Sequence, residues 1–74
     1  MRVTVKLYAS LQNGRSGEEA LEVPEGSPVR RVAADLGIAA GQVGILLVDG
    51  RHGKLDDVLR PGACVSLFPP IGGG

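Results

Sequence analysis

The sequence has few of the residue types on which nucleic-acid-binding domains rely. It contains no tryptophan, and its only aromatic residues are Tyr8 and Phe68. Its eight lysines and arginines balance eight aspartates and glutamates, and neither sign forms a run longer than two residues. Nucleic-acid-binding domains usually combine a basic patch with stacking aromatics. The composition therefore argues against nucleic acid as a partner.

Cysteine and long apolar stretches are scarce as well. Cys64 is the only cysteine, so the chain has neither a disulfide framework nor a cysteine-rich metal site, and we expect no metal. No apolar stretch approaches the ~20 residues of a membrane-spanning helix. The first ten residues alternate charged and apolar types, unlike the apolar run of a signal peptide. We expect a soluble, cytoplasmic chain without membrane contacts.

The length limits what the chain can do alone. A chain of 74 residues forms a single domain, and a domain of this size buries only about 60–65% of the surface that its unfolded chain exposes. A chain of this length can form one modest hydrophobic core, but it is too short to enclose much else. We therefore expect no deep, self-contained active site in this chain.

The first half of the chain predicts a hairpin followed by a helix. Residues 2–8 and 19–23 each alternate in polarity with the period of a half-buried strand, and Asn13-Gly14 lies in the turn between them. Ser27 is a suitable N-cap before Pro28 at the first helical position. The apolar stripe of the helix then consists of Val29, Val32, Ala33 and Leu36. Gly37 is the expected C-terminal stop, with Ile38 making the accompanying apolar contact.

The second half predicts further strands. Residues 45–48 are a continuous apolar run before the tight-turn signal Asp49-Gly50. A short strand or extended piece at Leu55, one helical turn and a turn at Pro61-Gly62 are expected next. Residues 63–68 alternate as a last strand. The order predicts an α+β, ubiquitin-like β-grasp fold, in which one main helix covers one face of a mixed four- to five-stranded sheet. The first and last strands would then be neighbours in its middle.

The two aromatic residues are expected on the uncovered face of this sheet. If the alternate residues Val65 and Leu67 lie under the helix, Phe68 falls on the other side, and so does Tyr8 of the first strand. The run at 45–48 adds either Ile45 and Leu47 or Leu46 and Val48 to that side. The pattern predicts an apolar patch, which often marks a partner site. The alternative is that Phe68 tucks under the last loop.

The chain ends in an unusually slim segment, Phe-Pro-Pro-Ile-Gly-Gly-Gly. Pro69 and Pro70 lack N–H donors and end the strand pairing, so we divide the chain into a domain at 1–68 and a flexible tail at 69–74. A terminal carboxylate is a poor electrophile and needs activation, for example as an adenylate. The chain has no phosphate-binding Gly-x-x-x-x-Gly-Lys-Ser/Thr loop, so a partner would supply the nucleotide. The alternative is a terminus without a role.

The whole chain, and most specifically its end, resembles the ubiquitin-like sulfur carriers of the MoaD/ThiS family. The family's typical ending has an Asn/Asp-Gly turn, a Leu-containing segment, a Pro/Asp-Gly turn, a Val-x-x-Phe strand, Pro-Pro and a terminal Gly-Gly. The matching residues here are Asp49-Gly50, Leu55, Leu59, Pro61-Gly62, Val65 to Phe68, Pro69-Pro70 and Gly73-Gly74. The Phe-Pro-Pro part is similar to the MoaD branch, whereas the extra glycine, Gly72, is similar to some ThiS endings.

The resemblance implies a function and a set of partners. Gly74 would be adenylated by an E1-like enzyme (MoeB- or ThiF-like) that uses ATP and Mg²⁺, and no cofactor would bind to this chain. A cysteine desulfurase or rhodanese-type donor would convert Gly74 to a thiocarboxylate, with Gly73 as its slim neighbour. In the MoaD branch the tail enters a MoaE-like large subunit to form molybdopterin synthase. Phe68 would be a docking residue, and the free chain is expected to be a monomer. The expected partner-binding residues are Tyr8, Phe68, Pro69, Pro70, Ile71 and Gly72.

Several alternatives stay open at this level. The resemblance implies a sulfur carrier that is not an enzyme, and its MoaD-like part favours molybdopterin biosynthesis (molybdenum or tungsten cofactor). The alternative pathways are thiamin thiazole, tRNA thiolation and cysteine synthesis. A ubiquitin-like modifier attached to lysines through Gly74, or a plain interaction domain, would share the same features. Cys64 is either a persulfide carrier or a half-buried strand residue. His52 is expected in a solvated loop, and Asp56-Asp57 are expected to cap the short helical turn.

Overall fold

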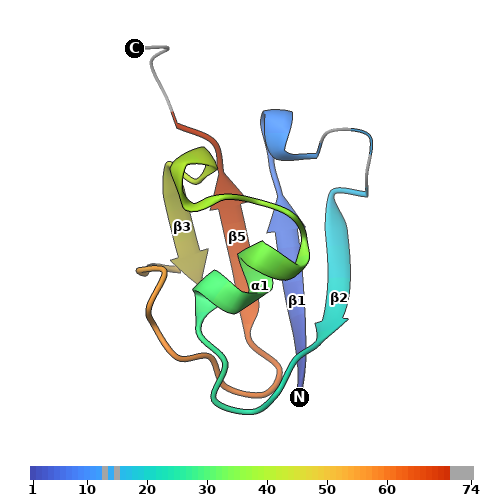
Figure 1. Cartoon of the computed structure of the whole chain (residues 1–74), viewed down its shortest axis with the longest axis vertical. Coiled ribbons are helices and arrows are strands. Elements are labelled where there is room, and N and C mark those ends of the chain that lie inside the picture. Colours follow the sequence, from blue (N-terminus) through green and yellow to red (C-terminus); the bar gives the residue numbers. More distant parts are fainter. Residues whose placement is uncertain (13, 15, 71–74) are drawn as a thin grey trace.

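The computed structural model describes residues 1–12, 14 and 16–70, which form a small sheet with a helix packed on it (Figure 1). The strands are β1 (Arg2–Leu7), β2 (Glu18–Glu22), β3 (Ile45–Val48), β4 (Arg51–His52) and β5 (Cys64–Phe68). The helices are α1 (Val29–Asp35) and two 3₁₀ turns, η1 (Ala9–Leu11) and η2 (Ala40–Gln42).

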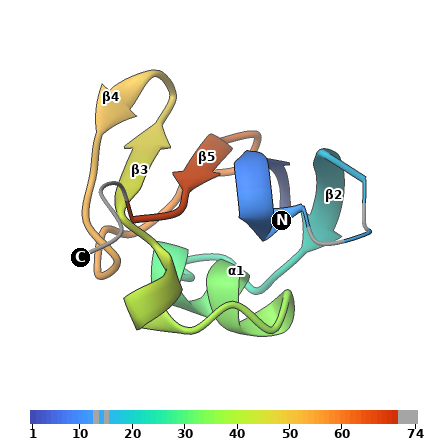
Figure 2. The same cartoon turned by 90° about the horizontal axis from the view of Figure 1, so that it is seen from above.

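The five strands are arranged in the order β2-β1-β5-β3-β4. Strands β1 and β5 pair in parallel at the centre, with Val5 opposite Val65, and the remaining neighbours pair antiparallel. Helix α1 and the segments that join it to the sheet lie on one face (Figure 2). The predicted mixed sheet, its central pairing of first and last strands and its single covering helix are all confirmed.

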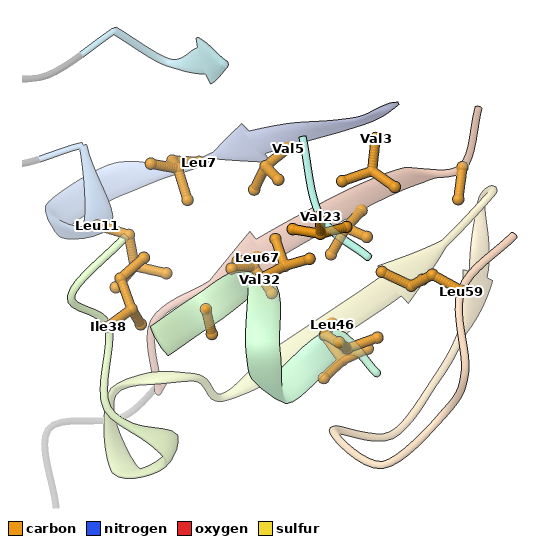
Figure 3. Close-up of a cluster of buried hydrophobic side chains, with 14 residues drawn as sticks. Val3, Val5, Leu7, Leu11, Val23, Val32, Ile38, Leu46, Leu59 and Leu67 are labelled. Atoms are coloured by element: carbon orange, nitrogen blue, oxygen red, sulfur yellow. The ribbon is translucent and has the colours of Figure 1, made fainter. Parts of the chain in front are cut away.

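The core lies between α1 and the sheet, as the sequence periodicity predicts. Alternate residues of the two central strands point toward the helix, and Leu7 and Leu67 are almost fully buried there (Figure 3). The helix contributes three buried residues of its predicted apolar stripe, whereas the fourth, Leu36, is only half-buried. Burial of one such side chain contributes about 1.5–3 kcal/mol. The core residues are Val3, Val5, Leu7, Leu11, Val23, Val29, Val32, Ala33, Ile38, Leu46, Leu59, Ala63, Val65 and Leu67.

Helix α1 ends as predicted and begins differently. At its C-terminus Gly37 adopts a φ of 74°, and the N–H groups of Gly37 and Ile38 donate to the carbonyls of Ala34 and Ala33. This is the expected glycine stop, with Ile38 buried. The predicted N-cap is wrong: Pro28 holds that position without a side-chain cap, and the Ser27 hydroxyl donates to the Pro24 carbonyl in the preceding turn. Ser27 is therefore satisfied locally and is not available to the helix.

The segment after β3 also differs from the prediction. The predicted tight turn is present, with Asp49 at φ 52° and Gly50 at φ 82°, and it leads straight into β4. His52 is thus an exposed strand residue and not a loop residue. No strand forms at Leu55, and the helical turn after it is absent from the structure as described. Asp57 instead closes a turn, accepting the Lys54 N–H at 2.8 Å.

None of the helices in the described part of the chain is long and apolar enough to cross a membrane.

Candidate functional site

The two aromatic side chains of the protein meet at one corner of the sheet. Phe68 is the last residue of β5, and Tyr8 directly follows the parallel strand β1. Their rings are stacked, with centroids 4.3 Å apart and planes inclined by 7°. Tyr8 remains 37% exposed, and Phe68 is half-buried. The expected placement of both rings away from the helix is therefore confirmed, and they form one surface.

Strand β3 extends this aromatic surface with aliphatic side chains. Residues directly opposite each other in an antiparallel pair share a face, and Ile45 lies opposite Phe68 while Leu47 lies opposite Ser66. Ile45 and Leu47 are thus the apolar pair on the open face, whereas Leu46 is buried under the helix. We call the four residues Tyr8, Phe68, Ile45 and Leu47 the aromatic corner.

Polar side chains border the aromatic corner on the same face. Lys6 and Ser66 are paired across β1 and β5, and His52 lies opposite Leu47. An apolar centre with a polar rim is the usual anatomy of a protein–protein interface. The described residues form no pocket, and no three histidine, cysteine or acidic side chains among them gather into a possible metal site. The apolar centre and polar rim of the corner suit it to docking another protein.

The chain leaves the sheet beside the aromatic corner. The Leu67 carbonyl accepts the Tyr8 N–H at 3.2 Å, and the Phe68 carbonyl accepts the Gly44 N–H at 2.7 Å. The end of β5 is thus held from both sides, and the two following prolines have no N–H with which to continue the ladder. Pro69 is half-buried and Pro70 is exposed. The aromatic corner and the start of the predicted tail therefore lie at the same end of β5.

Gly44 is the residue at this exit that the sequence reasoning missed. A Cβ atom at position 44 would lie 2.5 Å from the Pro70 Cα and 2.7 Å from the Pro69 carbonyl oxygen. Both are backbone atoms that cannot rotate away. The only signal in the sequence is a glycine next to a strand, which can mark a close approach of another backbone segment.

The remaining predicted site residues, Ile71, Gly72, Gly73 and Gly74, lie outside the described residues. Their roles as tail and as carriers of an activated carboxyl, and the boundary between domain and tail, stay predictions.

The other candidate residues have structural roles. Cys64 is half-buried in β5, and its N–H donates to the Asp49 carboxylate at 2.9 Å, which ties the β3–β4 turn to the last strand. Asp56 and Arg30 form an exposed ion pair, with 3.0 Å between the guanidinium nitrogen and the carboxylate oxygen. Because Asp57 closes a non-helical turn, the predicted capping of a helical turn by these two aspartates is wrong.

A mixed five-stranded sheet with one covering helix (Figure 2) defines a ubiquitin-like β-grasp protein. The family model described as "ThiS family" matches residues 5–74, and the chain belongs to this family. Proteins of this family are small and non-catalytic, and the chain, as a member, is not an enzyme. A comparison with curated proteins finds no significant match.

Solved structures show the same fold over nearly the whole chain. A putative molybdopterin converting factor subunit 1 from Pyrococcus furiosus is 28% identical, with a TM-score of 0.76 and coverage of 96% of this chain and 99% of that one. Small archaeal modifier protein 1 from Haloferax volcanii is 20% identical, with a TM-score of 0.78 and coverage of 95% and 98%. A complex of subunits 1 and 2 of the molybdopterin-converting factor from Helicobacter pylori matches at 20% identity, a TM-score of 0.66 and full coverage of both chains.

Proposed function

We propose that the chain carries sulfur on its C-terminal glycine, Gly74. The carboxylate of Gly74 attacks the α-phosphorus of ATP on an E1-like enzyme, and pyrophosphate leaves. The outer sulfur of a cysteine persulfide on a donor protein then displaces AMP from the acyl carbon. Two thiol equivalents then reduce the resulting acyl disulfide and are themselves oxidised to a disulfide, which frees the donor cysteine and leaves a thiocarboxylate on Gly74. The observation that carries this proposal is that the family model matches the chain through to Gly74.

The described surface supports a carrier that works through partners. The aromatic corner supplies an apolar docking area, and the last ladder bond, from Gly44 to Phe68, lies next to it. A partner bound at Tyr8 and Phe68 is thereby close to the point where the tail begins. Six residues from Pro69 to Gly74 span at most about 20 Å when extended. This length suffices for a terminal glycine to enter a catalytic site on the docked enzyme.

We propose molybdopterin biosynthesis, within the molybdenum or tungsten cofactor pathway, as the destination of the sulfur. Support comes from the Pyrococcus furiosus protein, whose name is molybdopterin converting factor subunit 1 and which matches at 28% identity over 96% of this chain. The Helicobacter pylori structure is titled as a complex of subunits 1 and 2 of that factor. A MoaE-like large subunit is accordingly the acceptor that we propose, in the cytoplasm, with a cysteine desulfurase or rhodanese-type protein as donor.

A ubiquitin-like modifier is the second candidate function. Structures of small archaeal modifier protein 1 from Haloferax volcanii and Methanosarcina acetivorans match this fold with TM-scores of 0.78 and 0.75. The activated carboxyl that accepts sulfur could also acylate a lysine amine. The two functions differ in the product: a thiocarboxylate on the free chain, or an isopeptide bond to another protein. A ThiS-like role in thiazole synthesis shares the thiocarboxylate and differs only in the acceptor.

The activation step is tested with the purified chain, its cognate E1-like enzyme, ATP and labelled pyrophosphate. We expect exchange of label into ATP that depends on the chain and is abolished by removal of Gly73 and Gly74.

Affinity purification on the thiocarboxylated chain then separates the pathways, because a MoaE-like or a thiazole-synthase-like acceptor is retained. Adducts in cell extract that disappear when Gly74 is deleted would favour the modifier. Absence of exchange with an active enzyme would refute the carrier function.

A further inference from the structure

Gly44 is a glycine for a different reason from most glycines in this fold. Five others have φ values between 74° and 84°, and a Cβ on any of them would meet nothing within 4 Å. At these five positions glycine is favoured by the backbone conformation and not by crowding from neighbouring atoms. Gly44 has no positive φ, yet a Cβ there would lie 2.5 Å from Pro70 Cα and 2.7 Å from Pro70 N. Glycine is therefore needed at this position only because the departing chain passes so closely.

The contact involves Pro69 and Pro70, the first two residues of the predicted tail. The Gly44 N–H donates to the Phe68 carbonyl at 2.7 Å, and Pro69 and Pro70 then pass the Gly44 backbone. Each proline has a fixed φ of about −65° and lacks an N–H donor. If the chain is displaced where it passes Gly44, neither proline can therefore donate a backbone hydrogen bond that would restore its path.

We infer that Gly44 is a positioning residue for the carrier function, fixing the direction in which the tail leaves the sheet beside the aromatic corner. This inference rests on the proposed function, since it states how Gly74 is aimed at the activating site. Carbon atoms in ordinary contact lie about 3.5–4.0 Å apart, so an alanine at position 44 displaces Pro70 by about 1 Å. Gly74 follows Pro70 by four residues, so the exit direction at Pro70 sets which part of the docked enzyme the terminal carboxylate can reach, and correct placement of a reacting group accounts for much of an enzyme's rate.

The kinetic test compares Gly44→Ala with Gly41→Ala in the pyrophosphate-exchange reaction with the cognate E1-like enzyme and ATP. Gly41 is the matched control, because it has no positive φ and a Cβ there meets nothing within 4 Å. We expect Gly44→Ala to lower kcat by about 10- to 100-fold while KM changes less than threefold, since the aromatic corner keeps its side chains. Gly41→Ala should match the wild type. An unchanged kcat, an equal loss in both variants, or a loss confined to KM would overturn the inference.

A second measurement on the wild-type chain does not depend on activation. We expect a nuclear Overhauser contact between the α-protons of Gly44 and Pro70, and slow exchange of the Gly44 amide that bonds to Phe68. In Gly44→Ala the amide at this position should exchange at least tenfold faster. Absence of the proton contact in the wild type would overturn the inference even if Gly44→Ala does not fold. Failure of the wild-type chain to be activated, with this contact present, would refute the carrier function and leave the position of the exit established.

Discussion

Tyr8 and Phe68 stack face to face across the end of the central parallel pair of strands, with ring centroids 4.3 Å apart. The two residues are 60 positions apart in the chain, yet they meet because β1 and β5 pair in register up to Leu7 and Leu67. The stack joins the first strand to the last at the place where the predicted tail begins. Stacked aromatic pairs contribute about 0.5–1.5 kcal/mol beyond their buried area.

Phe68→Ala should weaken docking far more than it weakens the fold. The ring is half-buried and shares the open face with Ile45, and loss of a central aromatic at an interface typically costs about 2 kcal/mol or more. We expect at least a tenfold loss of affinity for the E1-like enzyme, measured by titration calorimetry. Val58→Ala is the matched control, because Val58 is 65% exposed and lies outside the aromatic corner. An equal loss of affinity in both variants would show that the corner is not the docking surface.

Gly74→Ala should leave the free energy of unfolding unchanged and block transfer. The hydrophobic core has its last member at Leu67, and the substitution changes a residue seven positions later. Thermal unfolding by circular dichroism should give the wild-type midpoint, while the exchange reaction falls to background. A large drop in the midpoint would show that the terminal residue belongs to the folded domain.

Gly37→Ala should destabilise the protein by about 1 kcal/mol. Gly37 has a φ of 74° at the end of α1, and an L-residue pays about 1–2 kcal/mol in the left-handed region. For a domain of this size, 1 kcal/mol lowers the melting temperature by roughly 4–8 °C. Gly41 has no positive φ, so the free energy of unfolding of Gly41→Ala should stay within about 0.5 kcal/mol of the wild-type value. Equal stability of the two variants would contradict the assignment of Gly37 as the helix stop.

Asp49→Ala should destabilise the β3–β4 turn, and Asp49→Asn should be tolerated. The Asp49 side chain accepts the Cys64 N–H at 2.9 Å while its own φ is 52°. Asparagine keeps an acceptor oxygen and tolerates the left-handed region, whereas alanine does neither. Loss of the hydrogen bond costs about 1 kcal/mol, to be measured by urea denaturation. A destabilised Asp49→Asn with a stable Asp49→Ala would refute this explanation.

Local patterns were sufficient for the parts of the fold that depend on local physics. Alternating polarity places Val3, Val5 and Leu7 under the helix, and the glycine after Leu36 marks the helix end. The open-face position of Phe68 follows from the same alternation. These features are governed by the pleat of a strand and by backbone conformation, both of which operate within a few residues.

Features that local patterns leave ambiguous, or that depend on distant partners, were missed. Ser27 has the chemistry of an N-cap, but its hydroxyl donates to the Pro24 carbonyl three residues earlier, a competing local bond that the sequence does not distinguish from a cap. Strand β4 has two residues, too few to show any period. The requirement for glycine at position 44 arises from Pro69 and Pro70, which lie more than 20 residues away in the chain. No local pattern carries such information.

The central claim is that Gly74 carries sulfur, and intact-mass spectrometry tests it most directly. The chain is incubated with its cognate E1-like enzyme, ATP, a cysteine desulfurase, cysteine and a thiol reductant, with Gly74→Ala in parallel. We predict that the wild-type mass rises by the difference between one sulfur and one oxygen atom, and that the variant stays unchanged. A wild-type chain that keeps its original mass, although the same mixture converts a known carrier, would contradict the account.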